Sequence, residues 1–151
     1  MTKKKYYTWK DMNCAANSII QQMFQDNWKP DYIVGISRGG LPLAVMLSHK
    51  GGISMETLKV QLRDGDEQEV NPFLLADIKK GDKVLFVDDI NDSGSTFNWI
   101  EKNYKTNSAM SAARFAVMTE NSSSTFGGVS YSHDEVNKAE EDVWLVYPYE
   151  M

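Results

Sequence analysis

The sequence predicts an α/β protein, in which a twisted and mainly parallel sheet is flanked by helices. Two apolar runs, Tyr32 to Ile36 and Val84 to Val87, have the length of strands that are buried on both faces. Each run leads through a turn of small residues into a helical pattern, the order that parallel sheets require. With 151 residues, 42% of them hydrophobic, the chain can form one core, and we expect a single domain over residues 1–151.

The first third of the chain is expected to contain a helix, a strand and a second helix. Apolar residues recur at helical spacing over residues 8–28, and Thr8 with Asp11 has the form of a capping box. Cys14 lies in this helix and is expected to be at least half-buried. After the strand that begins at Tyr32, residues 41–50 predict the second helix.

The rest of the chain contains further strands and polar segments. Alternation predicts a strand at 53–62, and the polar residues 63–72 predict a loop, which is either a lid or an ordinary hairpin. The other assignments are a helix from the turn at 92–96 through Tyr104, a strand at 110–118, a loop at 121–128, a solvated segment at 131–142 and a strand-like run at 143–150.

A candidate phosphate site follows the strand at Val84 to Val87. Asp88 and Asp89 stand where that strand is expected to end, and the segment Asp92-Ser93-Gly94-Ser95-Thr96 then turns the chain into the helix. Such a turn exposes backbone N–H groups, the positive end of the helix and several hydroxyls, which together bind a phosphate. Two acids beside a phosphate site suit a ribose 5-phosphate, whose diol the acids would hold.

Other interpretations of this stretch explain less. A strand that ends in two acids is also typical of a Walker B motif, but no G-x-x-x-x-G-K-[ST] loop precedes it. A calcium-binding loop that starts at Asp89 fails, because Ile100 occupies the position of the bidentate glutamate. A purely structural turn seldom needs three acids beside three hydroxyls.

The loop Ser37-Arg38-Gly39-Gly40 is a second candidate anion site. Its glycines allow the backbone to approach a ligand closely, and Arg38 offers a planar fork for phosphate oxygens. The stretch from Gly35 to Gly39 also spells G-x-S-x-G, the nucleophile elbow of the α/β-hydrolases. That alternative needs His133 as the catalytic histidine, and it leaves the phosphate turn unexplained.

Composition limits the partners and the compartment. The net charge of −5 argues against a general nucleic-acid binder, and the only basic cluster, Lys3 to Lys5, is expected to be a solvated terminus. A single cysteine excludes an internal disulfide and fits a reducing compartment. The sequence has no signal peptide and no membrane-spanning run, so a cytoplasmic protein is expected.

The stretch from Val84 to Thr96 resembles the signature of the type I phosphoribosyltransferases. That signature is an apolar strand, two acids, two variable residues and then Asp/Glu-Ser/Thr-Gly-x-Thr. Thr8-Trp9, the loop at residues 37–40 and the end Trp144-Leu145-x-x-Pro148-Tyr149-Glu150 extend the resemblance to the small bacterial xanthine-guanine enzymes. The resemblance implies a sheet core over about residues 29–120, with a small hood built from the two chain ends.

The resemblance also implies roles for individual residues. Ser37, Arg38 and Gly39 would form a pyrophosphate loop whose Ser37-Arg38 peptide is often cis. Asp88 and Asp89 would hold the ribose hydroxyls, with Asp89 as a ligand of Mg²⁺. The residues implied to bind the 5-phosphate of phosphoribosyl diphosphate (PRPP) are Asp92, Ser93, Gly94, Ser95 and Thr96.

The nucleobase site is implied in the same way. Asp92 would manage the proton of the base, Trp144 would stack on it, and the Leu145 main chain would read its edge. The family transfers a phosphoribosyl group from PRPP to a base and releases pyrophosphate, here to a purine such as guanine, xanthine or hypoxanthine. A homodimer or homotetramer is expected.

Three departures from the family pattern concern the base and the lid. Asn121 stands where the purine enzymes have a lysine against the 6-oxo group, Glu150 replaces an aspartate, and Leu62-Arg63 replaces a Ser-Tyr pair. Because an amide is a weaker donor than an ammonium, Asn121 predicts weak use of oxo-purines, unless Lys138 or Arg114 takes the role of the lysine.

A regulatory protein that binds PRPP or nucleotides without turnover is the alternative on the same fold. Such a protein would keep every motif named above while controlling RNA or DNA. The low content of lysine and arginine in this chain argues against a regulator that binds RNA or DNA.

Overall fold

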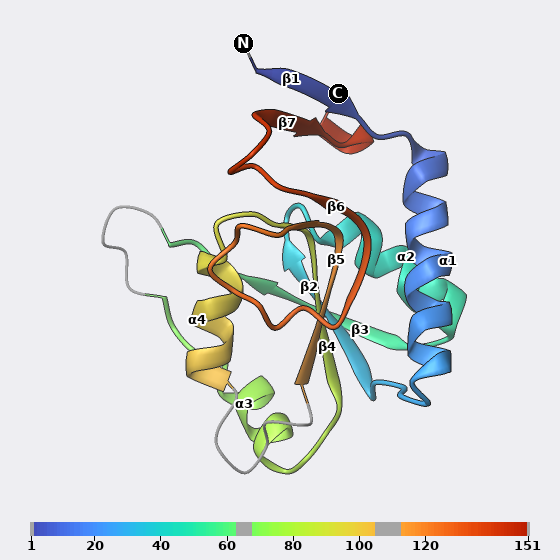
Figure 1. The fold of residues 1–151 in the computed structure, drawn as a ribbon. Helices are drawn as coiled ribbons and strands as arrows, with labels where there is room; N and C mark the ends of the chain where they lie inside the picture. The colour runs from blue at the N-terminus through green and yellow to red at the C-terminus, as the bar shows by residue number, and fades with distance from the viewer. Residues whose placement is uncertain (1, 63–67, 105–112, 151) are drawn as a thin grey trace.

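A five-stranded parallel sheet forms the centre of the protein (Figure 1). The computed structural model describes residues 2–62, 68–104 and 113–150. Every neighbouring pair in the sheet is parallel, in the order β3-β2-β4-β5-β6. The strands are β2 (Tyr32–Ser37), β3 (Ser54–Lys59), β4 (Val84–Asn91), β5 (Ala113–Asn121) and β6 (Tyr131–Val136).

Helices cover both faces of this sheet. Helices α1 (Trp9–Gln25) and α2 (Leu41–Gly51) pack on one face, and α3 (Pro72–Lys79) and α4 (Ser95–Tyr104) lie across the other (Figure 1). Alternate residues of β4 face the two sides, so that Leu85 and Val87 join the first core and Val84 and Phe86 the second. The predicted α/β class, with its parallel sheet flanked by helices, is confirmed.

The two ends of the chain form a small separate sheet. Strand β1 (Lys3–Tyr6) pairs in parallel with β7 (Val143–Val146), and a short 3-10 helix, η2 (Pro148–Glu150), follows. We call this unit the hood, as the family resemblance implies; it lies at one end of the molecule in Figure 1. Lys3 to Lys5 are exposed, as expected of a solvated terminus, but they belong to a strand.

Helix α1 begins with the predicted capping box. The Thr8 hydroxyl accepts from the Asp11 N–H at 3.1 Å, and the Asp11 carboxylate accepts from the Thr8 N–H at 2.8 Å. The expectation that Cys14 is at least half-buried is wrong, because Cys14 is exposed. The buried stripe passes through Met12 and Ala15, and a residue between them points away from it at 3.6 residues per turn.

Three elements differ from the sequence-based assignments. Strand β4 continues to Asn91, because β5 pairs with it as far as Asn91 opposite Glu120, so the acid pair lies within the strand. Helix α3 was missed, since Asn71 and Pro72 looked like turn formers but are its N-cap and first residue. The solvated segment at 131–142 contains the polar edge strand β6.

The described parts of the chain contain no helix with both the length and the apolar character needed to cross a membrane. Residues 110–112 of the strand predicted at 110–118 and residues 63–67 of the predicted loop lie outside the described ranges.

Gly40 lies close to the backbones of β2 and β4. A Cβ at this position would lie 2.3 Å from the carbonyl oxygen of Val87 and 2.8 Å from that of Ile36, whereas a Cβ at Gly127 would meet nothing within 4 Å. We expect Gly40→Ala to lower the free energy of unfolding by about 3 kcal/mol, and Gly127→Ala to change it by less than about 0.5 kcal/mol. Urea denaturation checks both values, and equal stability of the two variants would contradict the crowding at Gly40.

Candidate active site

The two predicted anion loops meet at the carboxyl edge of the sheet. Because β2 and β4 are neighbours, with Gly35 opposite Val87, the loop after Ser37 comes to lie beside Asp88 and Asp89. A Cβ on Gly39 would lie 2.3 Å from Oδ2 of Asp89, so only glycine fits between the loop and this acid. The Ser37-Arg38 peptide is cis, as the resemblance implies.

The acid pair is half-buried, and each carboxylate accepts a hydrogen bond from a neighbouring backbone N–H. Asp88 Oδ1 accepts from the Asp89 N–H at 2.9 Å, and Asp89 Oδ1 accepts from the Ile90 N–H at 2.8 Å. Burial, reinforced by the charge of Asp89, raises the pKa of Asp88 well above its ordinary value, and burial also raises the pKa of Asp89. A nearby cation favours the charged form of both carboxyls, so the pair suits a ligand that brings a positive charge.

The phosphate turn lies at the start of α4. Gly94 has a φ of +95°, a conformation that glycine adopts without strain, and a small cavity of about 80 Å³ is lined by Asp88 and by residues 90–97. The Ser93 hydroxyl accepts from the Ser95 N–H at 3.3 Å. Ser93 and Ser95 are exposed, so their hydroxyls can reach a ligand. The geometry is that of a phosphate site at a helix N-terminus.

The loop after β5 forms hydrogen bonds with this turn. Thr125 donates to the Ser93 carbonyl through its N–H at 3.0 Å and through its hydroxyl at 2.8 Å. The buried Asn91 amide donates to Glu120 Oε1 at 2.7 Å and to the Phe126 carbonyl at 2.9 Å. Sequence reasoning missed Asn91, although its position between two acids and the phosphate turn was a signal.

Lys138, one of the two residues predicted as alternatives to the family's lysine, lies next to Asp92. The Lys138 Nζ donates to Asp92 Oδ2 at 3.0 Å and lies 5.9 Å from the centre of the Trp144 ring. Arg114, the other alternative, lies instead against the Trp28 ring, with its Cζ 4.8 Å from the ring centre. Of the two residues, the structure therefore brings only Lys138 to the site.

Asn121 is engaged with the protein on both sides of its amide. Its Nδ2 donates to the Asp92 carbonyl at 2.9 Å, and its Oδ1 accepts from the Lys138 N–H at 3.0 Å. The Ser123 N–H and hydroxyl approach the same oxygen at 3.3 and 2.9 Å. Only 5% of Asn121 is exposed at the end of β5. Asn121 thus ties Asp92 to Lys138, and its Nδ2 faces two oxygens of Asp92, the carbonyl at 2.9 Å and Oδ1 at 3.4 Å, rather than a base.

The other predicted base contacts are spread over the hood. Trp144 is 57% exposed, which leaves a ring face for stacking, whereas the Leu145 side chain is buried and only its main chain can meet a ligand. Glu150 accepts from the Tyr147 N–H at 2.8 Å. Glu150 lies with Arg38 and Asp89 along a wide cavity of about 1090 Å³, whose lining does not include Trp144.

Known proteins resemble this chain over its whole length. A family model described as "Phosphoribosyl transferase domain" matches residues 2–144. The chain belongs to that family. Xanthine-guanine phosphoribosyltransferases of Vibrio parahaemolyticus and Vibrio vulnificus are 29% identical to it over 153 aligned positions, which cover 100% of this chain and 92% of theirs. The predicted family and its enzyme class, a phosphoribosyltransferase acting on a nucleobase, are confirmed.

Solved structures agree on the fold. A purine phosphoribosyltransferase from Pyrococcus horikoshii superposes with a TM-score of 0.75 at 23% identity, over 99% of this chain and 95% of that one. A xanthine-guanine-hypoxanthine phosphoribosyltransferase from Helicobacter pylori gives 0.74 at 16% identity, over 100% and 95%. At this sequence identity, the superpositions support only the fold of the phosphoribosyltransferase.

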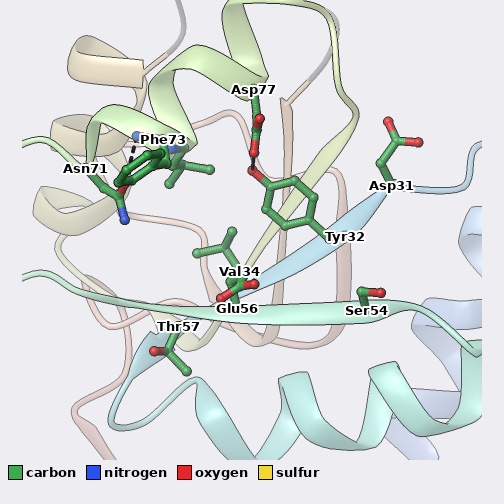
Figure 2. Close-up of a pocket in the computed structure, with 10 residues that line it drawn as sticks. Asp31, Tyr32, Val34, Ser54, Glu56, Thr57, Asn71, Phe73 and Asp77 are labelled. Carbon is green, nitrogen blue, oxygen red and sulfur yellow. Dashed lines mark hydrogen bonds between the residues drawn. The ribbon is translucent and has the colours of Figure 1, made fainter.

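Another cavity of the phosphoribosyltransferase lies beside the edge strand β3 and under α3, and has a volume of about 470 Å³ (Figure 2). Asp31, Glu56 and Asp77 line it, and Asp77 accepts from the Tyr32 hydroxyl at 3.0 Å. Among the residues that the structure describes, no lysine or arginine lines this cavity. A cavity with three carboxyl groups and no cationic lining repels phosphates. This cavity is therefore poorly suited to a phosphorylated ligand.

The geometry of the phosphoribosyltransferase excludes the serine hydrolase alternative. Ser37 ends β2 and His133 lies on β6, with β4 and β5 between them. Three steps across a sheet at about 4.8 Å each separate the two residues by roughly 14 Å, far beyond a hydrogen bond. His133 is also exposed. Residues 63–67 of the predicted lid or hairpin at 63–72 lie outside the described residues, and Gln68 Oε1 accepts from the Gln61 N–H at 2.9 Å across the base of this loop.

Proposed function

We propose that this phosphoribosyltransferase uses a 6-oxo-purine, namely guanine, xanthine or hypoxanthine, as the acceptor of the phosphoribosyl group of PRPP. The observation that carries the proposal is the Lys138 ammonium, held between Asp92 and the face of Trp144. A base that stacks on Trp144 meets a charged donor there, which favours an exocyclic oxygen over an amino group. The names of the Vibrio relatives support the same class of base.

This proposal replaces the expectation that oxo-purines are weak substrates. That expectation depended on Asn121 as the only group opposite the 6-position. The Asn121 amide holds Lys138 by its backbone N–H instead, so a lysine from the segment after β6 supplies the donor that the end of β5 lacks.

PRPP would lie between the two anion loops. The exposed Arg38, with Ser37 and Gly39, would bind the pyrophosphate, and Ser93 to Thr96 at the start of α4 would bind the 5-phosphate. Asp88 and Asp89 would hold the ribose hydroxyls.

The acid pair fits Mg²⁺, with Asp89 as the proposed ligand. The described residues contain no group of three or more His, Cys, Asp or Glu side chains that holds an ion by itself. Two half-buried carboxyls suit Mg²⁺, which is bound through one or two carboxylates together with waters and substrate phosphates. When bound, the ion neutralises charge on the departing pyrophosphate.

In the proposed mechanism a ring nitrogen of the base forms a bond to C1 of the ribose, and the bond from C1 to pyrophosphate breaks. The transition state has oxocarbenium character, so positioning and the neutralisation of the leaving group provide most of the catalysis. Asp92 accepts the proton of the base, and Lys138 holds that carboxylate in place before the base arrives. Trp144, the Leu145 main chain and Glu150 would complete the base site.

The base assignment is tested with Lys138→Met. We expect kcat/KM for guanine, xanthine and hypoxanthine to fall roughly 10- to 100-fold, the loss of one charged hydrogen bond, and the KM for PRPP to change little. Lys10→Met on the exposed face of α1 is the matched control. Unchanged activity with guanine, or an equal loss with adenine, would contradict the assignment.

A panel of bases separates the enzyme from the regulatory alternative. Release of pyrophosphate from PRPP with at least one oxo-purine supports the proposal. PRPP binding without turnover on any base, together with salt-dependent binding to RNA or DNA, would favour the regulator. We further propose a homodimer or homotetramer in the cytoplasm, and analytical ultracentrifugation tests the oligomeric state.

A further inference from the structure

The hydroxyl of Tyr149 lies between the pyrophosphate loop and the acid pair. It donates to the Gly39 carbonyl at 2.9 Å, and it lies 3.0 Å from Asp89 Oδ2. These acceptors belong to the loop after β2 and to β4, whereas Tyr149 comes from the hood. One side chain thus connects three segments that are far apart in the sequence.

The ring of Tyr149 is held independently of its hydroxyl. It stacks on Tyr147 with the ring centres 5.7 Å apart and an interplanar angle of 11°, and Trp9 lies against it at 6.3 Å. Aromatic pairs at these distances are stabilising in their own right. Removing the hydroxyl alone should therefore leave the hood in place, and the role of the hydroxyl can be separated from that of the ring.

The carbonyl of Gly39 matters to a pyrophosphate in particular. A carbonyl oxygen that turned toward the ligand would repel its negative oxygens, and the Tyr149 hydroxyl keeps this one bound to the hood. Gly39 also has no space for a side chain against Asp89 Oδ2, so the orientation of the carboxylate sets the position of the loop. The hydroxyl oxygen is within hydrogen-bond distance of both acceptors, so its single proton can be shared between them.

We infer that Tyr149 is a positioning residue that holds the Gly39 carbonyl and the Asp89 carboxylate together, and so prepares the loop for a ligand with a pyrophosphate group. The inference rests on the assignment of residues 37–39 to the pyrophosphate. It assigns no contact with the base or with the 5-phosphate to Tyr149.

Tyr149→Phe tests this role, because it keeps the ring and removes the hydroxyl. We expect the KM for PRPP, and that for pyrophosphate in the reverse reaction, to rise about 10-fold, since the Gly39 carbonyl loses its donor. The KM for the base and kcat at saturating PRPP should change less than about 2-fold. A residue that only stabilised the fold would weaken all the ligands alike.

Tyr147→Phe is the matched control in the hood. The Tyr147 hydroxyl donates to Thr119 Oγ1 at 3.0 Å and lies 3.2 Å from the Asp89 carbonyl, and no hydrogen bond of this residue reaches the pyrophosphate loop in the described part of the chain. This variant should leave the ratio of the KM values for PRPP and base unchanged. Tyr149→Phe with an unchanged or lowered KM for PRPP would overturn the inference, the latter by showing that the hydroxyl competes with the ligand.

Calorimetry with pyrophosphate and with a nucleoside monophosphate keeps the test independent of turnover. The inference expects weaker pyrophosphate binding and unchanged nucleotide binding in Tyr149→Phe. Equal weakening of both would overturn it. If the wild type converts no base at all, the proposed function fails, but the binding comparison still decides the role of Tyr149.

Discussion

Replacement of Asp92 by asparagine is expected to lower kcat about 100-fold or more, as expected for a general acid–base residue. The amide cannot accept the proton of the base, yet it keeps the shape of the side chain beside Lys138. The dissociation constant for PRPP should stay within about 3-fold, because the negatively charged Asp92 carboxylate does not attract an anionic ligand. Rapid-quench measurement of the chemical step and calorimetry with PRPP check the two halves of this prediction.

Asp82→Asn is the matched control for that experiment. Asp82 precedes the amino end of β4, whereas Asp92 follows the carboxyl end of the same strand, so the control changes the same charge away from the site. Turnover should remain at the wild-type level in this control. Undiminished turnover in Asp92→Asn would remove Asp92 from catalysis and leave the positioning of the substrates as the main source of the rate.

Arg38→Ala is expected to weaken the binding of PRPP and pyrophosphate about 100-fold. A bidentate arginine contact with phosphate oxygens consists of two charged hydrogen bonds, each worth about 1.5 kcal/mol or more. Ribose 5-phosphate and a nucleoside monophosphate, which lack a pyrophosphate, should bind almost normally. Arg38→Lys keeps the charge but loses the planar fork, so it should recover only part of the loss.

Calorimetry with the four ligands gives the required comparison. Arg114→Ala is the control, since this arginine donates to the Tyr131 hydroxyl at 2.6 Å and pairs with Asp26 at 3.2 Å. It should leave all four affinities unchanged even if the protein becomes less stable. An equal loss of affinity for all four ligands in Arg38→Ala would contradict the assignment of Arg38 to the pyrophosphate.

The centre of the fold could be predicted from the sequence because its strands are buried on both faces. Val84 to Val87 and the run at Tyr32 form continuous apolar stretches, which are typical of parallel strands enclosed by helices on both faces. Both anion loops were predicted for the same reason, since each follows directly from one of these strands. The polar edge strand β6 and the exposed β1 carry no comparable pattern and were missed.

The environment of the base could not be predicted in the same way. Lys138 reaches Asp92 across 46 positions of sequence, and its place depends on where β6 ends and on the bond from its N–H to Asn121. Nothing in a local pattern records such a contact. The family motif assigned the contact with the 6-position of the base to Asn121. This residue has the expected position in the chain, but its amide is bonded to Asp92 and Lys138.

The pairing of β1 with β7 has a consequence for how the enzyme is made. Both anion loops are complete once the first 96 residues have been synthesised, and β4 can already pair with β2 at that stage. The hood needs its first strand, made at the beginning, and its last strand, made more than 130 residues later, so this contact has a high loop-closure cost and forms late. A nascent chain would thus possess its phosphate-binding half before its base-binding half. Under the proposed site assignments, the residues that select the base are synthesised after those that bind the phosphates.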